Sequence, residues 1–289
     1  MNYHSPRSVK EAVDLLAAHP GAAHVLAGGT DLLVKLRAGF VAPDLVVDVK
    51  AIPQLRGIQS DANGFRIGAA TSCAEIGENA VLAAAWPGVV EALQLIGSTQ
   101  IQGRATLGGN LCNASPAADS VPAMIAAGAV VAIVGPEGRG ECRFEDIVSG
   151  SGQTLPPSAR ETSWCRSCCR NVRRGRETAI CASSRVPGMD IAVVGAGINL
   201  TFDAAGVCTD ARVSIGAVAE RALLVHEGTA ALIGSTIDEH ALSAWRPPVS
   251  AACCPVETNA EPRNTGSKIV GVMARRATHI ALHRAQRTN

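Results

Sequence analysis

The segment at residues 100–122 constrains the fold of this chain more than any other. It lies between two apolar runs and reads Q-I-Q-G-R-A-T-L-G-G-N-L-C-N-A-S-P-A-A-D-S-V-P. Its paired glycines allow positive φ and close backbone approach, and its Thr, Asn, Ser and Asp residues supply short polar side chains. The composition predicts neither a good helix nor a good strand. It favours a backbone cradle whose N–H groups face a phosphate-bearing ligand.

A second loop of the same kind lies upstream, where residues 26–33 read L-A-G-G-T-D-L-L. A strand at 24–27 is expected to deliver it, and a helix at 31–38 to follow it, so that a ligand would meet a helix N-terminus. Taken alone, this loop could be a strand–turn–helix junction whose glycines serve geometry only. Two separated Gly-Gly loops, each next to a Thr, instead predict one extended ligand with two phosphates.

Composition limits the classes of function. The chain has 289 residues, a formal net charge of +1 and 47% hydrophobic residues. A near-neutral chain has no electrostatic footprint for nucleic acid. No apolar run approaches the ~20 residues that span a bilayer, and no signal peptide is evident, so we expect a cytoplasmic protein. Most of the ten cysteines are expected to be buried thiols.

Hydrophobic periodicity predicts an α+β chain. Ser8 is expected to cap the first helix, with Glu11 completing a capping box. The predicted helices span 8–18, 31–38, 71–76, 88–96, 121–127, 236–244 and 269–285. The predicted strands span 24–27, 45–49, 66–69, 130–134, 191–202 and 207–216. We interpret 1–160 as one domain with two lobes, 1–55 and 56–160, and 189–289 as a smaller C-terminal domain.

The motifs resemble those of the FAD-binding medium subunit of molybdenum hydroxylases, the group of xanthine dehydrogenase, aldehyde oxidase and aerobic carbon monoxide dehydrogenase. A-G-G-T-D-L and R-A-T-L-G-G-N-L-C-N-A-S-P-A-A-D carry the resemblance. The stretches M-D-I-A-V-V-G-A-G and V-S-I-G-A-V-A extend it toward the C-terminus. The resemblance implies an α+β fold: a two-lobed PCMH-type FAD-binding domain followed by a small α+β C-terminal domain.

The resemblance also implies which residues would bind FAD. The first loop would surround the pyrophosphate, Thr106 and the paired glycines would line the pyrophosphate and ribityl region, and Asp119 would accept hydrogen bonds from sugar hydroxyls. Asn113 and Ser115 could equally be structural, and hydrogen bonds from Asn and Asp side chains could make the second motif a rigid loop. The predicted cofactor-binding residues are Val25, Leu26, Ala27, Gly28, Gly29, Thr30, Asp31, Leu32, Ile96, Thr106, Gly108, Gly109, Asn110, Ser115, Asp119, Asp190 and Ile191. No catalytic residue and no metal ligand is predicted.

The implied function is electron transfer through FAD to NAD, a quinone or another acceptor. The chain has no Cys-x4-Cys-x2-Cys cluster motif and no room for a molybdopterin domain. We therefore expect a [2Fe–2S] small subunit and a molybdopterin large subunit as partners, in a heterotrimer or a dimer of heterotrimers. Two alternatives stay open: a frame-disrupted remnant without flavin, and a stand-alone flavin oxidase of the vanillyl-alcohol type.

Two windows depart from the family pattern, at 162–188 and 253–267. The first has neither helical nor strand periodicity and is rich in Cys and Arg. A metal site at Cys165, Cys168, Cys169 and Cys181 is disfavoured because a second matching pair is missing. We hypothesise that both windows are translated out of frame. If GC-rich codons are assumed, a shift of the reading frame by two bases gives an amino-acid sequence that resembles the family in each window. The original frame would place a Lys or Arg near the flavin at position Ala182. As written, the chain is expected to fold poorly in both windows, because unpaired buried guanidiniums are costly.

Overall fold

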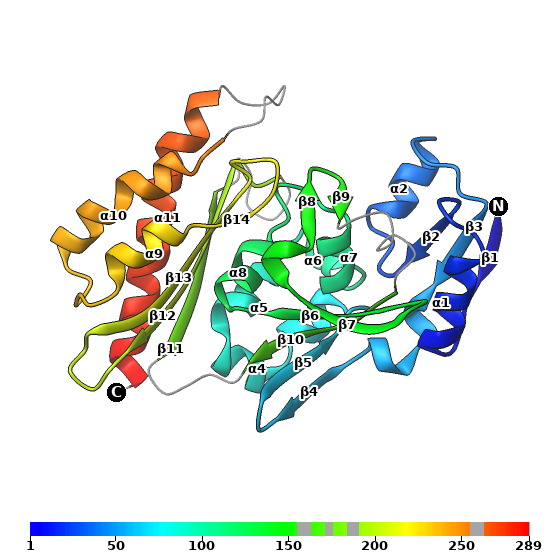
Figure 1. Ribbon diagram of the computed structural model, residues 1–289, viewed down its shortest axis with the longest axis horizontal. Coiled ribbons are helices and arrows are strands. Elements are labelled where there is room, and N and C mark those ends of the chain that lie inside the picture. Colours follow the sequence, from blue (N-terminus) through cyan, green and yellow to red (C-terminus); the bar gives the residue numbers. More distant parts are fainter. Residues whose placement is uncertain (155–162, 171–175, 184–190, 255–262, 289) are drawn as a thin grey trace.

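In the described residues, three β-sheets of three or more strands follow one another along the long axis of the molecule, and a two-stranded sheet accompanies the second (Figure 1). The structure, a computed structural model, describes residues 1–154, 163–170, 176–183, 191–254 and 263–288. The N-terminus lies at one end of this arrangement and the C-terminus near the other. Among the described helices, none combines the length and the apolar character that crossing a bilayer requires.

The first sheet is parallel, with strand order β1-β3-β2. Its core joins α1 to the sheet through residues such as Leu16 and Val47. The elements of this lobe are β1 (Asn2–His4), α1 (Val9–Ala17), β2 (Ala23–Leu26), α2 (Leu32–Arg37), β3 (Leu45–Asp48) and the 3-10 turns η1 (Val49–Ala51) and η2 (Pro53–Leu55). Because the strands are parallel, β2 and β3 both end at the edge where the first glycine loop begins.

The predicted cap of α1 is present in part. The Ser8 hydroxyl accepts a hydrogen bond from the Glu11 backbone N–H at 3.2 Å. The Glu11 carboxylate accepts from the Arg7 N–H at 2.9 Å, one residue before the position that a capping box uses. The helix therefore starts where the sequence predicted, with a shifted reciprocal bond.

The second sheet has strand order β4-β5-β10-β6-β7, so its last strand in sequence lies in its middle. Six short helices and a small hairpin connect and cover it. Its strands are β4 (Ile58–Asp61), β5 (Gly64–Gly68), β6 (Val130–Gly135), β7 (Gly138–Arg143) and β10 (Ser163–Arg170). The covering elements are α3 (Cys73–Gly77), α4 (Ala80–Ala85), α5 (Pro87–Gln94), α6 (Thr99–Gln102), α7 (Leu107–Cys112), α8 (Ser120–Ala126), η3 (Phe144–Asp146), β8 (Val148–Gly150) and β9 (Gln153–Thr154).

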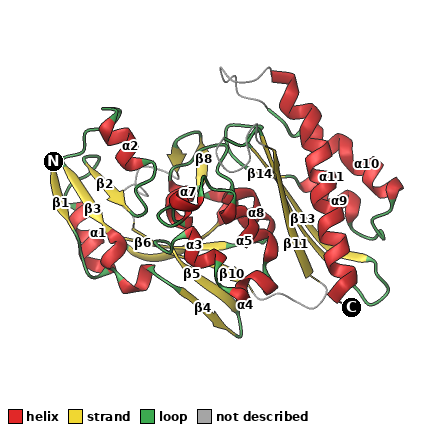
Figure 2. Ribbon diagram, turned by 180° about the vertical axis from the view of Figure 1, so that it is seen from behind, coloured by secondary structure: helices red, strands yellow, loops and turns green. Residues whose placement is uncertain are grey.

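The third sheet is antiparallel and lies between two layers of helices, as both ribbon views show (Figures 1 and 2). Helices α9 to α11 cover its outer face, and α5 and α8 of the preceding domain pack against the inner face. Its elements are β11 (Arg176–Ser183), β12 (Val194–Phe202), β13 (Cys208–Gly216), β14 (Leu223–Leu224), α9 (His226–Leu232), α10 (Glu239–Ala251) and α11 (Arg263–Thr288).

The inner face of the third sheet carries glycines because α8 lies directly on it. A Cβ at Gly197 would come within 2.4 Å of the Pro122 carbonyl oxygen, a separation that real Cβ atoms do not show. At Gly195 the nearest atom, Pro122 Cγ, would be 3.5 Å away, which is an ordinary contact. The sequence V-V-G-A-G therefore serves close packing of β12 on α8, although its glycine spacing resembles the start of a dinucleotide-binding turn.

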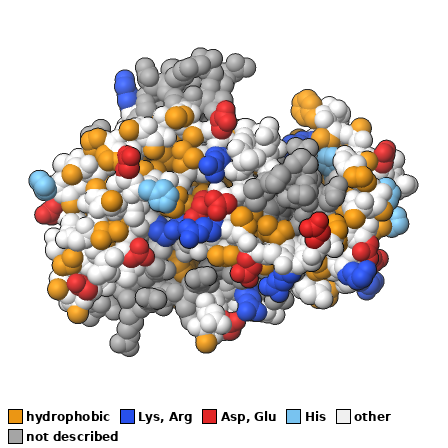
Figure 3. Space-filling model, in the orientation of Figure 1, with side chains coloured by type: hydrophobic (Ala, Val, Ile, Leu, Met, Phe, Trp, Pro, Cys, Tyr) orange, Lys and Arg blue, Asp and Glu red, His pale blue; other side chains and the backbone are white. Residues whose placement is uncertain are grey.

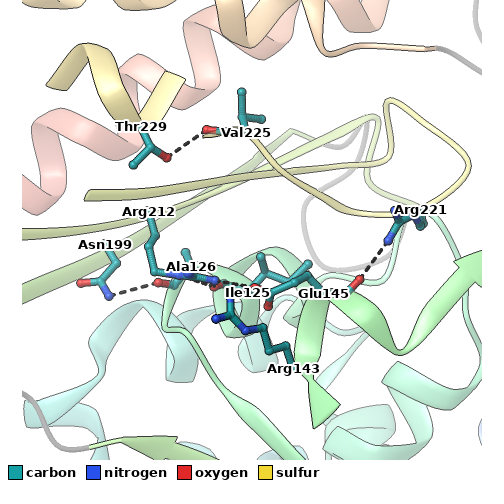
Figure 4. A network of polar contacts seen from close by, with 9 residues as sticks. All are labelled: Ile125, Ala126, Arg143, Glu145, Asn199, Arg212, Arg221, Val225 and Thr229. Atoms are coloured by element: carbon teal, nitrogen blue, oxygen red, sulfur yellow. Dashed lines mark hydrogen bonds and ion pairs between the residues drawn. The ribbon is translucent and has the colours of Figure 1, made fainter. Parts of the chain in front are cut away.

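A polar network joins this sheet to the end of α8 (Figure 4). Arg212 donates from Nε and Nη2 to the Ile125 carbonyl at 3.0 and 2.9 Å, and from Nη2 to Glu145 Oε1 at 2.9 Å. Asn199 Nδ2 donates to the Ala126 carbonyl at 3.0 Å. Carbonyls at a helix C-terminus lack intrahelical partners and carry partial negative charge, so the Arg212 cation stabilises this end of α8.

One expectation about the central motif is wrong. Residues 100–122 are not devoid of helix: α6 ends and α8 begins inside them, and α7 occupies Leu107–Cys112. Thr106 makes this possible, because its hydroxyl accepts the Gly109 N–H at 3.0 Å and caps α7. Thr106, a short polar residue that is typical of loops, here acts as a helix cap, whereas Asp119 precedes α8 without a capping hydrogen bond from its side chain.

Candidate functional site

A cavity of about 510 Å³ lies where the two glycine motifs meet, with residues of β2, α2, α7 and the adjoining loops in its wall. A volume in this range is typical of sites for small molecules and cofactors. Most of the predicted binding residues line it. They are Val25, Ala27, Gly28, Gly29, Thr30, Asp31, Leu32, Ile96, Thr106, Gly108, Gly109 and Asn110.

The first loop presents unpaired backbone donors. It leaves β2 after Leu26, turns at Gly29 with φ of 84° and enters α2. In the part of the chain that the structure describes, the N–H groups of Gly28, Gly29 and Thr30 have no acceptor. Backbone donors left without acceptors are costly unless a ligand or water accepts from them. Since α2 has only six residues, these amides matter more than its dipole.

The second motif differs from the expected amide cradle. The Gly108 N–H donates to the Ala69 carbonyl at 3.0 Å, and the Gly109 N–H donates to the Thr106 hydroxyl. A Cβ at Gly108 would lie 2.7 Å from both the Cβ and the carbonyl oxygen of Ala69. These two amides are thus used within the protein, and Gly108 is required for close packing of α7 on the end of β5.

The two motifs touch through their backbones. A Cβ on Gly28 would lie 2.2 Å from the Arg104 carbonyl oxygen and 3.0 Å from Ala105 Cα. Only glycine permits this approach. The first loop is therefore fixed against the entrance of the second motif, and the cavity is bounded by both.

A chain of side-chain hydrogen bonds also crosses between the lobes. Lys35 Nζ donates to Asn113 Oδ1 at 2.6 Å, and Asn113 Nδ2 donates to Asp31 Oδ1 at 3.0 Å. All three residues line the cavity. Asn110 is held separately, because its Oδ1 accepts from the Ser120 hydroxyl at 2.6 Å and from the Ser120 N–H at 3.3 Å.

Two titratable groups in the wall are kept neutral by burial. Burial, with a smaller effect of the Lys35 charge, lowers the pKa of His24. Burial raises the pKa of the Cys112 thiol far above its ordinary value. His24 therefore adds no positive charge beside Lys35, and Cys112 supplies no thiolate to offset the Lys35 charge.

The remaining predicted residues lie away from this cavity. Leu26 is buried behind the loop, and Ser115 Oγ accepts the Ala117 N–H at 3.3 Å. Asp119 borders a small hollow together with residues of the third sheet, including Gly195 and Gly216. Burial raises the pKa of Asp119 to about 7. Ile191 is 75% exposed. Asp190 falls outside the described residues.

The structure adds cavity residues that the sequence did not reveal, notably His24, Lys35, Cys112 and Asn113. Lys35 had a usable signal, since it stands four residues after Asp31 on the predicted helix and so shares a face with it. Asn113 was recognised as part of the motif without a role. Together the wall offers free amides, one ammonium group and an apolar surface, which suits an elongated ligand with an anionic middle.

Comparisons with known proteins agree with this description. Residues 1–161 match the family described as FAD binding domain in molybdopterin dehydrogenase, and residues 179–279 match the CO dehydrogenase flavoprotein C-terminal domain. The chain is 30% identical to the carbon monoxide dehydrogenase medium chain of Afipia carboxidovorans, over 99% of this chain and 98% of that protein. It is 28% identical to the nicotinate dehydrogenase FAD-subunit of Eubacterium barkeri, over 85% of this chain and 83% of that one.

A solved structure is similar throughout. Carbon monoxide dehydrogenase from Hydrogenophaga pseudoflava, in a form that lacks the Mo-pyranopterin moiety, contains a chain that superposes with a TM-score of 0.93. The two chains are 29% identical, and the match covers 98% of each. The family matches, the whole-chain identity and this superposition point the same way: the chain belongs to the family of FAD-binding medium subunits of molybdenum hydroxylases, which are oxidoreductase subunits of the carbon monoxide and xanthine dehydrogenase type.

Proposed function

We propose that the chain holds FAD in the cavity between its two glycine motifs and passes electrons from a partner's [2Fe–2S] clusters through that flavin to NAD or a quinone. The observation that carries this proposal is the first loop. It leaves the N–H groups of Gly28, Gly29 and Thr30 without acceptors among the described residues, at the wall of a 510 Å³ cavity. Backbone nests of this kind bind phosphate groups.

The cavity lining suits the diphosphate and an adjoining apolar part of the cofactor. The diphosphate would lie against residues 28–31 and beside Thr106, while Val25 and Ile96 would provide apolar contact for a ring system. Asp119 and Ser115 lie nearer the third sheet, so they would serve the part of the cofactor that extends beyond the cavity. Asp190 and Ile191 would act at that same end.

When bound, FAD supplies the capacity to exchange one or two electrons, and the protein supplies binding and orientation. Gly28 allows the first loop to lie against Arg104 at the entrance of the second motif, and Gly108 allows α7 to pack on Ala69. Together the two glycines would set the position of the diphosphate. Buried apolar residues such as Ile96 exclude water from the wall. We assign no acid–base residue.

The partners follow from the family. Relatives are named as a medium chain or an FAD-subunit, which implies companion chains in their complexes. In the portion of this chain that the structure covers, no group of His, Cys, Asp and Glu is arranged to hold a metal ion. We propose a [2Fe–2S] small subunit and a molybdopterin large subunit as partners, in a cytoplasmic heterotrimer or a dimer of heterotrimers.

Flavin uptake tests the proposal. The purified full-length chain, incubated with FAD and desalted, should retain about one flavin per chain with its characteristic absorbance. It should reduce an acceptor only when both partner chains and their substrate are present. A chain that stays colourless after FAD treatment would overturn the proposal. Oxidation of an alcohol by the isolated chain, with oxygen as the acceptor and hydrogen peroxide as the product, would favour the stand-alone flavin oxidase instead.

We also infer that residues 162–188 and 253–267 are translated out of frame. The support lies in the first window: the two family matches leave residues 162–178 unmatched, whereas the second match runs through residues 253–267. In the backbone register of β10, Ser167 stands opposite Ile67 and Val131, which are both buried. A polar residue at the centre of a sheet, between apolar partners, contradicts the pattern of the neighbouring strands.

Sequencing of the encoding DNA decides the matter directly. An intact frame, with codons that forbid the family-like peptides, would overturn the inference. Independently, Ser167→Val should stabilise the chain by about 1 kcal/mol, because an apolar β-branched residue suits a central strand better than serine does. A matched Ser149→Val change, at an exposed position of β8, should have little effect.

A further inference from the structure

Lys35 is the feature of the cavity that the proposed function leaves unused. It is the one Lys or Arg among the described residues that line the cavity. It lies on α2, one turn after the glycine loop, and is half-buried. The single acidic residue of the same lining is Asp31.

Lys35 and Asp31 do not pair with each other. Asn113 stands between them: its Oδ1 accepts from Lys35 Nζ at 2.6 Å, and its Nδ2 donates to Asp31 Oδ1 at 3.0 Å. Within the described residues Lys35 forms no ion pair. An ammonium group has three donors, so two of them have no acceptor in this part of the chain.

The surroundings of Lys35 favour an anion. The N–H groups of Gly28, Gly29 and Thr30 are free of protein acceptors on the same cavity wall. His24 lines the same wall, and burial, with a smaller contribution from the Lys35 charge, lowers its pKa. A half-buried cation without a carboxylate partner gains most from a ligand that carries negative charge.

We propose that Lys35 is the exchangeable counter-ion of the cofactor diphosphate and selects FAD over flavins that lack the second phosphate. In this structure Asn113 holds the ammonium group; a phosphate oxygen would replace the Asn113 amide oxygen as acceptor. Asn113 would at the same time keep the Asp31 carboxylate engaged and away from the phosphates. The inference rests on the proposed function, which it deepens by naming a specificity-determining residue.

Binding of three flavins by the full-length chain tests this role. FAD, FMN and riboflavin would be titrated at low and high salt, with flavin fluorescence as the readout. Lys35→Met should weaken FAD binding roughly 10- to 100-fold, as expected for loss of a charged hydrogen bond. It should leave riboflavin binding unchanged and reduce the salt dependence of FAD binding. Lys35→Arg should retain most of the FAD affinity.

Lys10→Met is the matched control. Lys10 lies on α1, pairs with Asp14 and is exposed, so its loss should not alter any of the three titrations. Lys35→Gln provides a second variant with a polar side chain of similar length. Failure of both Lys35 variants to fold, judged by circular dichroism, would make Lys35 a structural residue and overturn the inference.

The outcomes separate the two proposals. If the unmodified chain takes up no FAD, the proposed function itself fails. If the unmodified chain binds FAD but Lys35→Met binds it equally well, with the same salt dependence, only the role of Lys35 is overturned. Equal loss of FAD and riboflavin binding would also overturn it, because riboflavin has no phosphate for Lys35 to contact.

Discussion

The contact between Gly28 and Arg104 allows a sharp test of how the cavity is assembled. In Gly28→Ala, the new methyl group would sit 2.2 Å from the Arg104 carbonyl oxygen and 2.9 Å from its carbonyl carbon. Both are backbone atoms, so no side-chain rotation relieves the clash. The first loop and the second motif must therefore separate, at a cost of about 1–3 kcal/mol for overpacking of a well-packed site.

The expected result combines lower stability with lost flavin binding. A domain of 150–250 residues loses roughly 2–4 °C in Tm per kcal/mol, so a drop of several degrees is expected in thermal unfolding followed by circular dichroism. FAD affinity should fall further than stability does, because the amides of Gly28 and Gly29 move with the loop. Desalting after FAD treatment should leave little bound flavin.

Gly103→Ala is the matched control, since it lies one residue before Arg104. Its Cβ would meet only the Gln100 and Thr99 carbonyls, at 3.6 and 3.9 Å, which are ordinary contacts. The change should be neutral or slightly stabilising, because alanine restricts the unfolded chain. If Gly28→Ala matched Gly103→Ala in both Tm and FAD retention, the argument for a backbone contact between the two motifs would be wrong.

Three further predictions concern the contact between the domains. Gly197→Ala should destabilise the chain by about 1–3 kcal/mol in urea unfolding, because its Cβ would lie 2.4 Å from the Pro122 oxygen. Gly195→Ala, its control, should change stability by less than about 0.5 kcal/mol. Equal effects of the two changes would refute the packing argument. Arg212→Met should lower the free energy of unfolding by about 1.5–3 kcal/mol, because the hydrogen bonds of the guanidinium group to Ile125 and Glu145 are lost. The same change should cost less in a Glu145→Gln background. An undiminished cost there would show that Arg212 and Glu145 do not couple. Burial raises the pKa of Asp119 from 3.8 to about 7. Between about pH 4 and pH 7 the flavin-free folded chain therefore keeps a proton on Asp119 that the unfolded chain releases. The free energy of unfolding should fall as the pH rises through this range. Asp119→Asn should thus be more stable than the parent above pH 7 and similar to it near pH 4; parallel pH profiles would contradict the shift.

Much of the fold could be predicted from local sequence. The cap at Ser8, the strand at Leu45–Asp48 and the helix at Ser120–Ala126 all lie where periodicity and capping placed them. The turn after Phe202 was also visible, because Asp203 Oδ1 accepts from the Ala205 and Val207 N–H groups, as Asp residues do in such turns. These features depend on residues within a few positions of one another.

Features that depend on tertiary contact could not be predicted in this way. Helix α7 contains two adjacent glycines, and its stability comes from the Thr106 cap and from packing on Ala69. The same glycines were expected to offer free amides, but only the first loop does so. Lys35 gained its significance from Asn113, which is distant in sequence and close in space. The boundaries of the domains, and the suspected change of frame, stay predictions.

The distribution of charge on the surface indicates little about the partners of the protein. On the face drawn in Figure 3, the Lys, Arg, Asp and Glu side chains of the described residues are interspersed, and those residues form no broad field of one sign. A surface of this kind gives no long-range steering toward a particular partner, so any recognition of companion chains through it would depend on local shape and pairing.

The position of β10 in the second sheet has a consequence for how the chain is made. Its neighbours are β5 and β6, which a ribosome completes well before residues 163–170 emerge. Until then the nascent polypeptide holds two separate hairpins, β4–β5 and β6–β7, with their inner edges unpaired. Exposed strand edges invite association with other molecules, so the growing chain is most vulnerable to aggregation during that interval. A fragment ended at residue 161 would remain permanently in this incomplete condition.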